Sequence, residues 1–314
     1  LTSSIIGKDY IIHCPNILEL LLNFDEEERP DFITLYFQVF TDLPAFSDPL
    51  HPQISPPIID EKTLASIKKF KETNAGQVTL YYEQGGKYVG KVMEYNGQII
   101  RHGHGCFYDP KDNLIFDGIW HQDFPKNGIY IYNEDYRYEG TWEGFFHEGK
   151  GVLYFRDSPL YEGDWQNFKY HGYGKLYYEN GNLKYEGEFK LSMKHGTGKS
   201  YYPDGSLYHV GFYKEGKMND RGTIYWPDGN INFEGEILVS GIDNIFMKGT
   251  FYEESQPDKK GNLYVGELFN NKYHGKGARY DSKGNTLDSG DWYLGELIKG
   301  EPQDRILTAV IPTY

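Results

Sequence analysis

From about residue 77 onward, large aromatic side chains alternate with charged ones along the chain. Tyr161, Gly163 and Trp165 are each separated by one residue, and the intervening positions hold Glu162 and Asp164. Residues two apart in a β-strand face the same side, so the pattern predicts a strand with one aromatic and one charged face. The glycine between two large rings leaves room for an aromatic side chain of a neighbouring strand to lie over the backbone.

The aromatic-glycine-aromatic unit recurs with a period near 24 residues. Asn-Gly and Asp-Gly pairs, as at Asn180-Gly181 and Asp204-Gly205, recur with it and favour the tight turns of β-hairpins. A single hairpin must pair with neighbours to bury its rings. We therefore predict an all-β repeat array of about eight to nine hairpins, or about 18 strands, in one elongated single-layer antiparallel sheet. The glycines that anchor the units are Gly90, Gly118, Gly140, Gly163, Gly187, Gly211, Gly235, Gly266 and Gly290.

The first 76 residues have a different composition. Residues 17–24 and 32–40 each predict an amphipathic helix, and five prolines follow between residues 44 and 57. Proline continues neither a helix nor a central strand, so this stretch predicts an extended linker. Asp60 suits a helix N-cap, and we expect the helix after it to cover the open edge of the array. The predicted organisation is a helical segment 1–43, a linker 44–59, a capping helix 60–76, the array 77–300 and a tail 301–314.

Charge and cysteine usage narrow the classes of function. The chain has 46 acidic and 32 basic side chains, a net charge of −14. This argues against nucleic-acid binding, because phosphate recognition depends on clustered Lys and Arg. The only two cysteines, Cys14 and Cys106, lie 92 residues apart in the sequence and make neither a disulfide framework nor a metal knuckle, which favours a reducing compartment, the cytoplasm. No stretch reaches the ~18 apolar residues of a membrane-spanning helix.

Residues 161–181 (YEGDWQNFKYHGYGKLYYENG) and 185–205 (YEGEFKLSMKHGTGKSYYPDG) resemble the MORN repeat almost throughout, and the resemblance extends from residue 77 to about residue 300. It implies a scaffold built of β-hairpins. Arrays of this family occur in radial-spoke head proteins of cilia, in junctophilin-type membrane-junction proteins and in the basal complex of apicomplexan parasites. Some precede a kinase or methyltransferase domain, and this chain shows no signature of either.

Residues 15–40 are more weakly similar to the docking helices of protein kinase A regulatory subunits and Dpy-30 proteins, the RIIa/Dpy-30-like segment. That resemblance implies a homodimer formed by paired helices. The alternative is that two amphipathic helices pack on the end of the array.

The aromatic positions are the candidate partner-binding residues. These rings are expected to form the core of the array. However, a single-layer sheet has no second layer to cover its aromatic face, so part of the rings would stay exposed. Tyr and Trp are frequent anchors at protein interfaces, and exposed ring strips mark partner surfaces. Partner binding is therefore predicted for rings of three repeats and of the N-terminal segment: Tyr138, Trp142, Tyr161, Trp165, Tyr185, Phe189, Phe32, Tyr36 and Phe40.

Two motifs resemble a phosphate-binding loop and a metal site, but each lacks residues that such a site needs. Residues 196–200 (GTGKS) lack the first glycine and the following helix of a phosphate-binding loop. His102 and His104 lack a third ligand nearby in the sequence, and His-Gly pairs belong to the repeat itself. We expect no catalytic, metal or cofactor site.

The leading hypothesis is a non-enzymatic scaffold that positions other proteins in a large assembly, at the cilium (axoneme or radial spoke) or elsewhere in the cytoskeleton. A peripheral membrane adaptor that binds acidic phospholipids is the second hypothesis. It is disfavoured because such lipids attract clustered basic residues, and here bases and acids are interspersed. The third is an accessory subunit that recruits an enzyme through residues 1–60.

Overall fold

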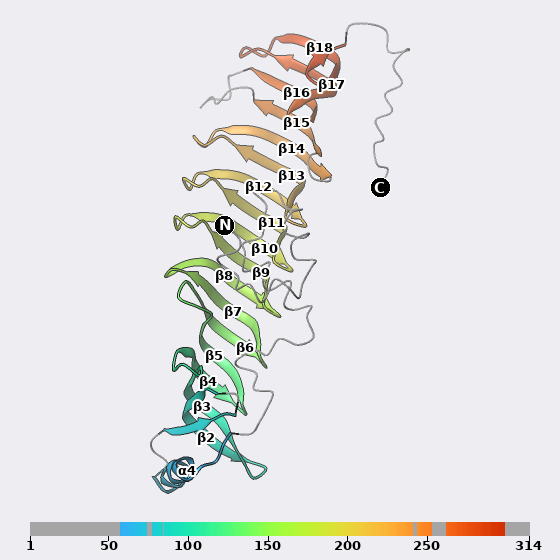
Figure 1. Cartoon of the computed structure of the whole chain (residues 1–314). Helices are drawn as coiled ribbons and strands as arrows, with labels where there is room; N and C mark the ends of the chain where they lie inside the picture. The colour runs from blue at the N-terminus through green and yellow to red at the C-terminus, as the bar shows by residue number, and fades with distance from the viewer. Residues whose placement is uncertain (1–56, 74–76, 84, 241–243, 253–261, 299–314) are drawn as a thin grey trace, which may run out of the picture. The chain divides into compact units, whose positions relative to one another are not determined.

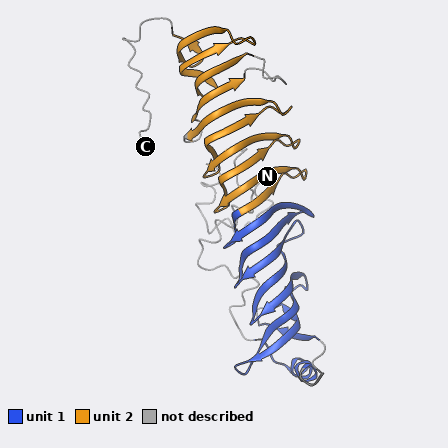
Figure 2. Ribbon diagram, turned by 180° about the vertical axis from the view of Figure 1, so that it is seen from behind, with its two compact units in different colours: residues 1–172 blue, residues 173–314 orange. Residues whose placement is uncertain are grey.

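The computed structural model describes residues 57–73, 77–83, 85–240, 244–252 and 262–298. These residues form one helix and 19 β-strands, which belong to a single open antiparallel sheet in which consecutive strands pair (Figure 1). The predicted fold class is confirmed, with one strand more than the estimate. The sheet divides into two compact units, residues 1–172 and 173–314 (Figure 2), and each is described by itself.

Unit 1 holds the helix and the first strands of the array. In chain order these are α4 (Glu61–Thr73), β1 (Val78–Tyr81), β2 (Lys87–Tyr95), β3 (Gln98–Tyr108), β4 (Leu114–His121), β5 (Phe124–Ile131), β6 (Tyr136–Glu143), β7 (Phe146–Phe155) and β8 (Ser158–Gln166). The next strand, β9 (Lys169–Tyr177), begins in unit 1 and ends in unit 2.

Unit 2 continues the same hairpin pattern. Its strands are β10 (Leu183–Lys190), β11 (Met193–Tyr201), β12 (Leu207–Lys214), β13 (Lys217–Tyr225), β14 (Ile231–Ser240), β15 (Asn244–Tyr252), β16 (Leu263–Phe269), β17 (Lys272–Tyr280), β18 (Thr286–Tyr293) and β19 (Glu296–Leu297).

Two kinds of turn alternate along the array. Asn180-Gly181 and Asp204-Gly205 join one repeat to the next, and Gly181 and Gly205 have the positive φ angles expected of them, 84° and 91°. The turns inside the repeats often lack glycine. Asn167 and Phe168, for example, both adopt left-handed conformations, with φ angles of 49° and 64°. The sequence signal for turns therefore found the connections at Asn180-Gly181 and Asp204-Gly205 and missed turns without glycine, such as Arg156-Asp157 between β7 and β8.

The helix α4 lies at the start of the sheet, at the same end as β2 (Figure 1). Its N-terminus is capped by Asp60, whose Oδ1 accepts a hydrogen bond of 2.7 Å from the backbone N of Thr63. The helix contacts β1 and buries Ile67, and the inward residues of β1, Val78 and Leu80, have no exposed surface. The helix thus packs on the first strand, and its role as the cover of the open edge stays a prediction.

Candidate interaction surfaces

Tyr185 shows how a repeat packs its ring. It shares one face of β10 with Gly187, whereas the neighbouring Glu188 points to the other face and is exposed. Gly187 pairs with Gly198 on β11, and a Cβ on either glycine would collide with the Tyr185 hydroxyl. The ring therefore lies flat over a pair of glycines, which is the close approach that the sequence predicted.

The tyrosine hydroxyls of this face are bonded to the backbone. In five repeats the hydroxyl donates to the carbonyl three residues further along its own strand, at distances of 2.6–3.0 Å. Burial raises the pKa of Tyr264 to about 12, so the phenol stays a neutral donor. The five tyrosines are Tyr88, Tyr138, Tyr161, Tyr185 and Tyr264.

In two repeats a tyrosine from the second strand covers the other side of the ring. Tyr170 stacks on Tyr161 with ring centroids 3.8 Å apart, and Tyr273 stacks on Tyr264 at 4.2 Å. We call this place on the second strand the stacking position. Because these rings lie between the glycine backbone and a stacking residue, a sheet with no second layer still buries them.

The six rings predicted as partner contacts lie in this core. Their exposed fractions run from 0 to 4%. The rings therefore present almost no surface of their own, and their role as partner contacts stays a prediction. The six are Tyr138, Trp142, Tyr161, Trp165, Tyr185 and Phe189. Phe32, Tyr36 and Phe40 lie outside the described residues.

The nine anchor glycines all form cross-strand pairs with other glycines. Gly118, for example, pairs with Gly105 on one side and with Gly128 on the other. Gly235 likewise pairs with Gly222 and Gly249. Gly105, Gly128 and Gly249 belong to these glycine rows although the sequence analysis did not single them out. The spacing in the sequence could have identified them, since each follows an anchor glycine by 10 to 15 residues.

Histidines occupy two tyrosine places of the core, one in each unit. His147 is fully buried at a stacking position and lies on Tyr138, with its Nε2 2.9 Å from the Tyr132 hydroxyl. Burial holds the pKa of His147 well below its usual value. In unit 2, His209 replaces the ring that covers the glycines, and burial lowers its pKa to about 4. Both stay neutral at physiological pH, so they act as core rings.

A short chain of polar atoms accompanies His209 in unit 2. Its Nδ1 lies 2.7 Å from the Tyr213 hydroxyl, which lies 2.6 Å from Ser200 Oγ. Lys194 Nζ donates to the same Ser200 Oγ at 3.2 Å and lies 5.0 Å from the centre of the Tyr185 ring. Nothing in the sequence pattern predicted that these four side chains lie together.

A buried arginine occupies the stacking position of the first hairpin. The Arg101 side chain is 2% exposed, and its Nε lies 3.0 Å from Asp123 Oδ1. Its guanidinium lies over the Trp120 ring at 4.2 Å. The sequence analysis missed this residue, because its place in the core follows only from the pairing of β2 with β3.

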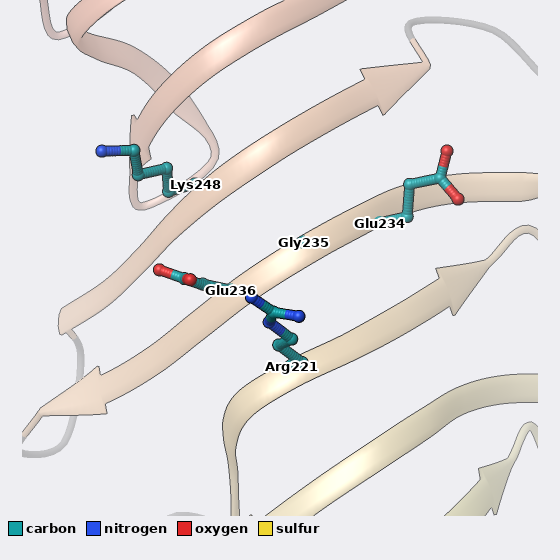
Figure 3. Close-up of a pocket in the computed structure, with 5 residues that line it drawn as sticks. All are labelled: Arg221, Glu234, Gly235, Glu236 and Lys248. Atoms are coloured by element: carbon teal, nitrogen blue, oxygen red, sulfur yellow. The ribbon is translucent and has the colours of Figure 1, made fainter.

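On the opposite face of the sheet, one row of charged side chains on β13 to β16 alternates in sign from strand to strand. Arg221 pairs with Glu236, Glu236 with Lys248, and Lys248 with Glu267. Lys248 Nζ lies 3.5 Å from Glu267 Oε1. Figure 3 shows Arg221, Glu236 and Lys248 at a shallow depression that Glu234 and Gly235 also line. Acids therefore neutralise bases along this ladder, and no basic cluster forms on it.

Exposed phenylalanines lie at the hairpin tips of unit 1. Phe124 and Phe146 are 45% and 47% exposed. Phe124 lies 5.2 Å from Phe145, and Phe146 lies 5.4 Å from Phe168, measured between ring centroids. We call these four residues the tip cluster. It is an apolar surface that a partner can reach without opening the core.

The described part of the chain holds neither a metal-binding cluster nor a membrane-spanning helix. There, no group of three or more His, Cys, Asp or Glu side chains comes together to hold a metal ion. Within the same residues, no helix has the length and apolar character needed to cross a membrane.

A known family of repeats matches the hairpins of this chain. The MORN repeat model matches residues 99–113, 138–158, 161–183, 185–207, 209–231 and 264–286. Each of the last five stretches begins with the first strand of a hairpin and extends past its second strand. No curated protein matches the chain.

Proposed function

Because this chain is a MORN-repeat protein, we propose that it is a non-enzymatic scaffold that positions protein partners in a large assembly. MORN repeats commonly bind proteins or membranes as scaffolds. The observation that carries the proposal is that buried and exposed apolar side chains lie at different places in the array. The repeat rings are buried in the core, whereas apolar side chains at the hairpin tips and on the opposite face are exposed.

The charges favour protein partners over acidic lipids. Binding to an anionic surface needs several basic side chains close together, each contributing about 1 kcal/mol. In unit 2 the bases of the ladder alternate with acids. In unit 1, residues 77–172 hold 14 acidic and 9 basic side chains. Neither the balanced ladder of unit 2 nor the acidic excess of unit 1 attracts an anionic membrane, whereas exposed aromatic side chains are typical anchors of protein interfaces.

The buried polar groups support a structural role. His147 and His209 are the histidines with lowered pKa, and both are at most 1% exposed. A general acid or base needs contact with a substrate. These two groups instead fill ring positions of the repeat.

A pull-down tests the tip cluster as a protein contact. Phe124→Ser with Phe146→Ser should abolish capture of partners from the native cell, because both rings are exposed and exchangeable without loss of core. Tyr293→Ser, at an equally exposed tip of unit 2 (43%), is the matched control. Equal capture by both variants and the native chain would remove the tip cluster from the proposal.

The position of the protein in the cell tests which assembly it belongs to. We propose a ciliary or other cytoskeletal complex, on the basis of where arrays of this family occur. A tagged copy in its own cell should localise to the axoneme or cytoskeleton and co-purify with structural proteins. A free monomer in the lysate would contradict the scaffold. Salt-sensitive flotation with phosphatidylserine vesicles would instead support the membrane adaptor.

A further inference from the structure

Four large apolar side chains are exposed around the first strand and the start of the capping helix. Ile58, Ile59, Leu64 and Tyr81 have exposed fractions of 45, 43, 52 and 44%. The backbone N of Ile58 donates to the carbonyl of Tyr81 at 2.7 Å, and the two residues form an antiparallel bridge. Directly opposed residues project from the same face, so these two side chains are neighbours. We call the four residues the end patch.

Capping at this end of the sheet is incomplete. The helix α4 buries Ile67 and Thr63 on its inner side but leaves Leu64 on its outer side. Beyond β1, the described chain adds only the single bridge at Ile58. Terminal repeats of an array need a polar outer surface, and here four large apolar side chains are exposed beside the charged residues of α4. Covering the end patch would remove this apolar surface from water.

We propose that residues 32–40 of the same chain bind the end patch. The described structure begins at residue 57, immediately before Ile58, so the chain outside it ends at the patch itself. The nine residues FITLYFQVF include Phe32, Tyr36 and Phe40 and carry no charge. They match the patch in chemistry better than residues 17–24, which contain Glu19 and lie further away along the chain.

The tether permits this contact. Residues 41–56 connect the segment to the patch, and an extended chain of that length spans roughly 50 Å. Short tethers hold two groups at millimolar effective concentration, so a weak apolar contact suffices. The inference does not depend on the scaffold proposal. It assigns the rings Phe32, Tyr36 and Phe40 to an intramolecular contact, so a partner that binds them has to displace it.

Site-specific photo-crosslinking of the full chain tests the proposal. Replacing Tyr81 by p-benzoylphenylalanine puts the probe on an exposed ring without disturbing the core. Irradiation should give intramolecular crosslinks to the peptide that contains residues 32–40, in a yield unchanged by dilution. The same probe at Tyr293, equally exposed in unit 2, should give none to this peptide.

A second variant separates the contact from folding. Phe32→Ser, Tyr36→Ser and Phe40→Ser together should abolish the Tyr81 crosslink while the β-sheet circular dichroism spectrum stays unchanged. Crosslinks that join two chains, crosslinks to residues 17–24 alone, or no crosslink to residues 32–40 would each overturn the proposal. The first result would make the end patch an interface between copies.

Discussion

His147 lies flat on Tyr138, with ring centroids 3.6 Å apart and ring planes 5° from parallel. In the next repeat the same place is taken by Tyr170 on Tyr161, at 3.8 Å and 10°. Trp142 stands edge-on to His147 at 4.4 Å. A titratable ring thus occupies a site that elsewhere holds a neutral phenol, and burial lowers the pKa of His147 well below 6.5.

Unit 1 should lose stability in mild acid because of His147. At neutral pH the ring is neutral in both states and contributes no pH dependence. Below about pH 6.5 the unfolded state takes up a proton that the folded state resists, so the free energy of unfolding falls by up to about 1.4 kcal/mol per pH unit. The fall continues until the lowered folded pKa is reached. Urea unfolding followed by tryptophan fluorescence at pH 7.5 and 5.5 measures this fall.

His147→Tyr is the matched variant, since tyrosine already fills this position as Tyr170. The variant should remove the part of the acid sensitivity that belongs to His147 and leave the stability at pH 7.5 within about 1 kcal/mol. Identical pH dependence in the two proteins would show that His147 is not the buried group described here.

Gly198→Ala should destabilise unit 2 by about 3 kcal/mol. The added Cβ would overlap the hydroxyl and ring of Tyr185, and overpacking a rigid core costs this much when the neighbour has no room to move. Gly97→Ala is the control, because its site has a φ of 77° and no heavy atom within 4 Å. That change should cost only the backbone strain, about 1 kcal/mol. Equal costs in denaturant unfolding would contradict the packing.

Leu191→Asn should stabilise unit 2 by about 0.5–1 kcal/mol. Leu191 lies at a hairpin tip with a φ of 52° and is 47% exposed, and asparagine adopts this conformation at lower cost. Leu294→Asn, at a φ of 49°, should act in the same direction. Leu287→Asn should not, because Leu287 is equally exposed but lies within strand β18. Thermal melts of the three variants compare the sites.

Asp123→Ala should destabilise unit 1 by about 3 kcal/mol. It removes the carboxylate that pairs with the buried Arg101 side chain and leaves a buried cation with a weaker set of partners. Asp157→Ala is the control: Asp157 is 91% exposed and pairs with Arg137 at the surface. Both aspartates have φ angles near 68° (69° and 67°), so backbone strain is matched. The surface change should cost under about 1 kcal/mol.

The repeat and its faces were readable from the sequence because they depend on local geometry. Residues two apart in a strand share a side whatever the strand packs against, so Tyr185, Gly187 and Phe189 had to face one way. Gly181 and Gly205 mark turns because few other residues adopt their φ angles. These signals lie within a few residues of each other, and they were sufficient for the fold class and the family.

How the rings are covered was decided only by the tertiary structure. Arg101, His147, Tyr170 and Lys194 share no chemistry in the sequence, yet each lies against an aromatic ring of its unit. Their equivalence follows from cross-strand register and from bulges, such as the shift at Gly187/Glu188 in the pairing of β10 with β11. Register depends on contacts between strands that no periodic pattern records, and it determines which side chains the array buries and which it leaves for other molecules.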